Sequence, residues 1–128
     1  MRILSKSDFN HINDIIKIIP FSETTKEQRH FSDELRKAKV VEDAKLPIDV
    51  VKLTSHIIVE DITKGNVMKF QIVLPEMANV KEMKISVLAP LAIALMGFKK
   101  NLIVDWHMPA GPRKLKITSV DNPVADLV

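Results

Sequence analysis

The stretch KISVLAPLAIALMGFKKNLIVDWHMPAG, residues Lys84 to Gly111, organises the rest of this chain. A β-branched run from Ile85 to Leu88 predicts a strand that stops before Pro90. Proline has a preset φ and needs no partner for its nitrogen in the first helical turn, so Pro90 predicts a helix start. The residues that follow are all apolar, and Gly97 stands where a left-handed residue would end the helix.

This predicted helix is apolar on every side. About six residues cannot span a bilayer, which needs about 20, so the helix is expected to lie in a core across a sheet. The strand after it carries the single tryptophan, Trp106, which is expected to be a core or half-buried anchor. A turn over Pro109 to Gly111 follows.

Residues 1–46 predict a short antiparallel helical hairpin, because apolar residues recur in steps of three and four in two segments. These residues are Phe9, Ile12, Ile16 and Ile19, then Phe31, Leu35, Ala38 and Val41. Ser5 or Ser7 is the expected cap of the first helix, and Pro20 ends it. The second helix is expected to begin with a capping box, formed by Thr24 with Glu27 or by Thr25 with Gln28.

Residues 47–128 predict a second, sheet-containing domain that begins at Pro47. Three further segments are expected to be strands, and a turn containing Gly65 makes the first two a hairpin. The strands are Val50 to Glu60, Val67 to Leu74 and Lys114 to Val120. Strands packed on one short helix make the fold class α+β.

The run from Ile85 to Pro90, followed by a helix that ends in Ala, Leu, Met and Gly97, resembles the C-terminal domain of the bacterial Gre transcript-cleavage factors. Leu88 and Ala89 before the proline, with the Trp-x-x-Pro-x-Gly pattern that begins at Trp106, are more similar to the Rnk type, called regulators of nucleoside diphosphate kinase. The resemblance covers nearly the whole chain. It implies an FKBP-like antiparallel sheet domain with one short helix.

Composition argues against most ordinary enzymes. The chain has no cysteine, so disulfides and thiolate chemistry are excluded, and its four histidines lack metal-ligand spacing. No glycine cluster could cradle a phosphate, no Ser–His pair can be identified, and no cofactor is expected. The start shows no secretion signal, which favours the cytoplasm. The net charge of +3 fits an acidic partner, yet many lysine-rich domains share it, and sequence-specific nucleic-acid binding and membrane binding are not expected.

Two acidic residues near the expected hairpin tip, Glu23 and Glu27, are the first candidate site. In Gre factors, which this chain resembles, acids at the tip of a much longer coiled coil help to hold a catalytic magnesium. The arm from Ser7 to Ile19 is about 20 Å long at helical rise, which is short for reaching a buried centre, and the Gre tip motif is absent. The alternative is that Glu27 belongs to a capping box and Glu23 is solvated.

The corner formed by Leu88, Ala89 and Pro90 is the second candidate, a site for binding a partner. The resemblance implies docking on the rim of the RNA polymerase secondary channel, where Gre factors use the corresponding loop. The Gre pattern has an acid where Leu88 stands, so the contact differs chemically. Leu88 could instead pack inward.

The leading hypothesis is a non-enzymatic, cytoplasmic bacterial regulator that binds RNA polymerase near the secondary channel and competes with Gre factors without stimulating transcript cleavage. One alternative is an adaptor or regulator of another protein such as a kinase. A second is an FKBP-like peptidyl-prolyl isomerase, although fold does not imply function and the few aromatic residues supply little for such a pocket. The sequence does not indicate an oligomeric state.

Overall fold

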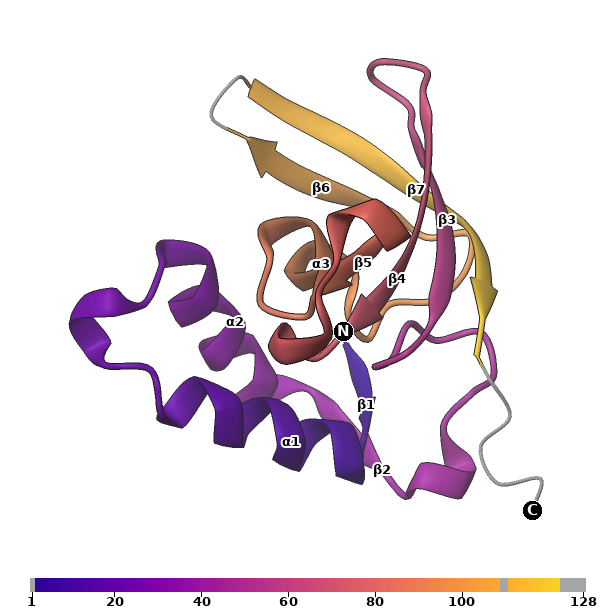
Figure 1. The fold of residues 1–128 in the computed structure, drawn as a ribbon. Helices are drawn as coiled ribbons and strands as arrows, with labels where there is room; N and C mark the ends of the chain where they lie inside the picture. The colour runs from indigo at the N-terminus through magenta and orange to yellow at the C-terminus, as the bar shows by residue number, and fades with distance from the viewer. Residues whose placement is uncertain (1, 109–110, 123–128) are drawn as a thin grey trace.

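The computed structural model describes residues 2–108 and 111–122, in which a two-helix arm stands beside a five-stranded sheet (Figure 1). The helices are α1 (Lys6–Lys17), α2 (Lys26–Lys37) and α3 (Pro90–Leu95). The strands are β1 (Ile3–Ser5), β2 (Lys39–Val41), β3 (His56–Asp61), β4 (Val67–Val73), β5 (Lys84–Ser86), β6 (Ile103–Met108) and β7 (Gly111–Asp121). The expected turn at Pro109 and Ala110 and the tail from residue 123 lie outside the described residues.

The arm consists of α1 and α2, and the structure decides between the alternative caps. Ser5 caps α1, since its Oγ accepts a hydrogen bond from the Asp8 N–H at 3.1 Å. The capping box of α2 uses Thr25 and Gln28, which exchange side-chain-to-backbone hydrogen bonds of 3.0 and 3.1 Å. Both helices therefore start where a side chain satisfies an amide that has no partner within the helix.

The arm is closed at its base by a small parallel sheet that the sequence did not predict. The apolar spacing predicts that Val41 belongs to the second helix, which is wrong: α2 ends at Lys37, and Val41 lies in β2. This strand pairs in parallel with β1. The extended conformation of Ala38 ends the helix, and the β-branched pair Val40 and Val41 suits the strand that follows. The chain thus enters the arm along β1, and after α2 it runs beside β1 in the same direction along β2.

The main sheet has the order β5-β4-β3-β7-β6. The α+β class with a helical hairpin and a sheet is confirmed, but the sheet is mixed rather than wholly antiparallel, because β5 pairs in parallel with β4. The predicted strand from Val50 was too long, since β3 begins at His56. Thr54 just before it has a positive φ of 74°, which is incompatible with an extended strand.

One face of the sheet is buried. Side chains alternate between buried and partly exposed along β3, as a sheet with one covered face requires. The helix α3 contributes Ala92, Ile93 and Leu95 to the same core. The predicted start at Pro90 is confirmed, and Gly97 has the expected left-handed φ of 82°.

The core is continuous between the arm and the body. Ile12, Phe31 and Leu35 from the arm belong to the same buried cluster as Val59 and Ile117 from the sheet. The division of the chain at residue 46 stays a prediction. Within residues 2–108 and 111–122, no helix is long and apolar enough to cross a membrane.

Candidate functional site

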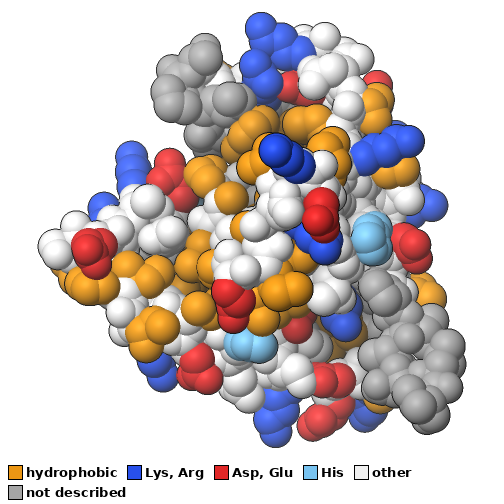
Figure 2. Space-filling model, viewed as in Figure 1, with side chains coloured by type: hydrophobic (Ala, Val, Ile, Leu, Met, Phe, Trp, Pro, Cys, Tyr) orange, Lys and Arg blue, Asp and Glu red, His pale blue; other side chains and the backbone are white. Residues whose placement is uncertain are grey.

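A groove of about 630 Å³ runs between α2 on one side and α3 with β6 on the other. Its lining is mostly apolar, and Figure 2 shows hydrophobic side chains gathered in the hollow between the arm and the body. The lining residues are Arg2, Lys26, Glu27, His30, Glu34, Pro90, Ile93, Ala94, Phe98, Leu102, Ile103, Val104, Asp105 and Trp106. Such an apolar concavity with a few charged groups is the usual form of a binding site.

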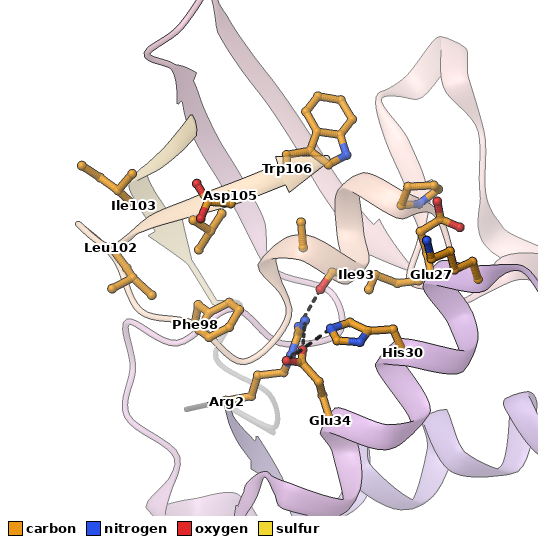
Figure 3. A pocket seen from close by; sticks show the side chains of 14 residues that line it. Arg2, Glu27, His30, Glu34, Ile93, Phe98, Leu102, Ile103, Asp105 and Trp106 are labelled. Carbon is orange, nitrogen blue, oxygen red and sulfur yellow. Dashed lines mark hydrogen bonds and ion pairs between the residues drawn. The ribbon is translucent and has the colours of Figure 1, made fainter. Parts of the chain in front are cut away.

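The groove brings together one residue from each predicted site. Glu27, from the hairpin, lies on α2 (Figure 3). Pro90 lines the same groove from the start of α3. Both side chains are exposed. Glu23 and Leu88 do not line the groove.

The base of the groove is closed by Arg2, whose place there the sequence did not predict. Its Nε donates to the Glu34 Oε1 at 2.8 Å, and its Nη1 donates to the carbonyl oxygens of Ile93 at 2.5 Å and Met96 at 2.8 Å. Burial lowers the pKa of Arg2, and the hydrogen bond and charge of Glu34 oppose that shift. A basic residue directly before a short strand could have been noticed, but no pattern shows that it is buried.

The two tip acids differ in their surroundings. Glu23 closes the 3-10 turn Phe21–Glu23 and is exposed, as is Glu27 in the first turn of α2. Glu27 is not the capping-box residue, because Gln28 has that role. An acidic residue in the first turn complements the dipole of α2.

The corner of Leu88, Ala89 and Pro90 forms a tight entry to α3. Ser86 organises it, since its Oγ accepts from the Leu88 N–H at 3.0 Å and its carbonyl accepts from the Ala89 N–H at 2.9 Å. Leu88 is half-buried and packs against the core, while Pro90 is exposed. Ala89 caps α3 through its backbone alone.

Trp106 is half-buried and packs against the core, as expected. Its indole Nε1 is a buried donor without a hydrogen-bond partner in the described part of the chain. Nearby, Asp105 forms an ion pair with Lys114 at 2.8 Å. Within the described ranges 2–108 and 111–122, no group of three His, Asp or Glu residues is placed to hold a metal ion.

The fold and the groove define the class of protein: an α+β body with a projecting two-helix arm and an apolar, charge-edged groove between them. The chain belongs to the GreA/GreB family, because residues 46–122 match the family model described as "Transcription elongation factor, GreA/GreB, C-term". The closer resemblance to the Rnk type stays a prediction.

Curated relatives are similar over most of this chain. The transcription elongation factor GreA of Bradyrhizobium diazoefficiens is 36% identical over 91 residues, which is 70% of this chain and 57% of that protein. The GreA of Syntrophomonas wolfei is 34% identical over 88 residues, covering 69% of this chain and 55% of that protein. The chain thus matches a little over half the length of these relatives.

Solved structures share the fold. A GreA/GreB elongation factor from Nitrosomonas europaea superimposes with a TM-score of 0.77 at 23% identity, covering 94% of this chain and 98% of that one. Gfh1 of Thermus aquaticus gives a TM-score of 0.53 at 18% identity, with 94% and 98% covered. The likeness extends through the helical arm, since nearly the whole chain is covered.

Proposed function

We propose that this protein is a transcription regulator that binds bacterial RNA polymerase near the secondary channel. The match of residues 46–122 to the GreA/GreB C-terminal domain carries this proposal, because these residues include the five-stranded sheet, α3 and the corner at Pro90. The relatives' shared designation as elongation factors supports polymerase as the partner class. The protein acts by occupying a site rather than by catalysis.

The docking surface is the corner of Leu88, Ala89 and Pro90. Pro90 is exposed at the edge of the groove, so a partner element that touches the corner can also fill the apolar hollow. Leu88 adds apolar surface beside it, although part of its side chain packs on the core. Burial of apolar area supplies most of the free energy of such contacts.

Docking is tested by measuring the affinity of purified protein for core polymerase. Leu88→Asp and Pro90→Glu are expected to weaken binding about tenfold or more by placing a charge in the apolar contact. Val67→Asp is the matched control, since Val67 is also exposed but lies at the start of β4, outside the groove. Unchanged affinity in both corner variants, with native circular dichroism, would show that the corner is not the contact.

The arm is too short to deliver an acid to a buried catalytic centre. The helices α1 and α2 have 12 residues each, which is about 18 Å at helical rise. Glu23 and Glu27 near the tip would then remain near the channel entrance. A magnesium site needs its carboxylate ligands in direct or water-mediated contact. Occupying the site without delivering acids makes the protein a competitor of Gre factors.

Competition is tested by titrating this protein into a stalled elongation complex, with and without a Gre factor. Gre-stimulated transcript cleavage is expected to fall as this protein is added, following the ratio of concentrations to dissociation constants. Addition of this protein alone is expected to leave cleavage at its intrinsic rate. Stimulation by this protein alone, lost in the Glu23→Ala, Glu27→Ala double variant, would contradict the argument from arm length.

A further inference from the structure

We propose that Arg2 is a positioning residue, which fixes the angle of the helical arm to the sheet body and so sets the width of the groove between Glu27 and Pro90. The inference deepens the function proposed above, and its first test does not depend on that function. Its basis is the set of contacts that Arg2 makes at the base of the groove (Figure 3).

The guanidinium of Arg2 joins two helices that belong to different parts of the fold. Toward the arm, its Nε and Nη2 contact the Glu34 Oε1 of α2 at 2.8 and 2.6 Å. Toward the body, its Nη1 donates to the carbonyl oxygens of Ile93 and Met96 at the C-terminal end of α3. Those carbonyls have no partner further along the helix, and a cation is favoured at this end of the helix dipole.

The guanidinium also contacts one aromatic ring from the arm and one from the body. Its central carbon lies 5.1 Å from the ring centroid of Phe31 in α2 and 4.7 Å from that of Phe98, which follows α3. Arg2 is 7% exposed, so these cation–π contacts and hydrogen bonds act with little water present. The planar, five-donor fork of arginine can make all of them at once, and lysine could not.

The backbone next to Arg2 is also fixed. The Ile3 N–H donates to the carbonyl oxygen of Gly97 at 2.9 Å. A Cβ on Gly97 would lie 2.9 Å from the Arg2 Cβ and 3.1 Å from the Ile3 carbonyl oxygen. The chain therefore approaches the end of α3 more closely than any residue but glycine allows.

Toward the tip of the arm, α2 carries Lys26 and Glu27, which line the groove above this base. Apolar packing from Phe31 and Leu35 anchors the other half of the helix but is not directional. Among the contacts of α2 with α3, those made through Arg2 are directional, and on this proposal they set how far Glu27 lies from Pro90.

The test measures the distance between arm and body in the free protein. The chain has no native cysteine, so two introduced cysteines can be labelled with nitroxides at unique positions. Ser22→Cys lies at the tip of the arm and Lys69→Cys on β4, and both positions are exposed. Pulsed electron–electron double resonance then measures the distance between the two labels. The parent is expected to show one narrow distance distribution. Arg2→Met and Glu34→Ala are expected to broaden it about twofold or to shift its mean, because the arm gains a hinge.

The matched control is Asp33→Ala, which removes the exposed ion pair between Asp33 and Arg36 on the same helix. It is expected to leave the distribution unchanged. A distribution as narrow as the parent's in folded Arg2→Met would overturn the proposal. If Arg2→Met does not fold, Glu34→Ala decides in the same measurement, since Arg2 then keeps its carbonyl partners.

Polymerase binding gives a second readout that a loss of stability alone would not change. If the arm holds the binding orientation about a tenth of the time in Glu34→Ala, the apparent dissociation constant rises about tenfold. The Asp33→Ala variant is expected to bind like the parent. Absence of polymerase binding in the parent would refute the proposed function and leave the distance result standing, so the two failures are distinguishable.

Discussion

Replacing Gly97 by alanine tests how closely the first strand approaches the end of α3. Gly97 has a φ of 82°, and an added Cβ would meet the Arg2 Cβ at 2.9 Å and the Ile3 carbonyl oxygen at 3.1 Å. The carbonyl is backbone and cannot move alone. Gly65 is the matched control, because its φ of 84° is nearly the same and nothing lies within 4 Å of its added Cβ.

The two substitutions separate backbone strain from steric conflict. A left-handed conformation costs an alanine about 1 kcal/mol relative to glycine, and this cost is common to both positions. At Gly97, moving the first strand away also weakens the 2.9 Å hydrogen bond from the Ile3 N–H, worth about 1 kcal/mol. Displaced packing around Arg2 adds about 1 kcal/mol more. The expected losses in unfolding free energy are about 3 kcal/mol for Gly97→Ala and about 1 kcal/mol for Gly65→Ala.

Urea unfolding followed by far-ultraviolet circular dichroism measures both losses. With an m-value of about 2 kcal/mol per molar, the midpoint should fall by about 1.5 M for Gly97→Ala and about 0.5 M for Gly65→Ala. Equal losses in the two variants would refute the reasoning, because the contact with the first strand would then contribute nothing.

Three further outcomes are expected. Burial raises the pKa of Asp8, and the hydrogen bond that its carboxylate accepts from the Leu53 N–H opposes this shift only in part. A raised pKa in the folded state means that the protonated side chain favours folding. This contribution to stability is full below the ordinary pKa of about 3.9 and is lost as pH rises through the raised pKa. Asp8→Asn should therefore gain stability relative to the parent between pH 4 and pH 7 in urea unfolding, and an unchanged difference would contradict this. Thr25→Ala should cost about 1 kcal/mol in the same assay by removing the capping box with Gln28, and no loss would show that the box is not formed in solution. In a peptide assay, prolyl isomerisation should stay at the uncatalysed rate, and a clear enhancement would contradict a non-enzymatic role.

The identity and the order of the main elements could be predicted from local sequence. Pro90 has its φ fixed by its ring, and Gly97 can adopt a left-handed φ because it lacks a Cβ, so each marks an end of α3 through its own covalent structure. The spacing of Phe31 and Leu35 likewise predicted a buried face, because the helical period puts them on one side. Short motifs around these residues were sufficient to indicate the family.

Pairing between distant segments could not be predicted in this way. The strands β1 and β2 pair in parallel across the whole arm, and β5 joins β4 in parallel, so neither follows from a turn signal. The choice between two capping boxes was also open, since Thr24 and Thr25 are both competent caps. In the structure Thr25 is the cap, while the Thr24 hydroxyl donates to the Phe21 carbonyl oxygen.

The candidate site shows the same division. The sequence by itself determined which residues carry charge or restrict the backbone, and it placed Glu27 near the arm's tip and Pro90 at a corner. Tertiary structure decided that these two line one groove. It also buried Arg2, whose hydrogen bonds to Ile93 and Met96 cross more than ninety positions. A side chain's chemistry is local, but its burial depends on which distant surfaces meet around it, and only the folded chain brings those surfaces together.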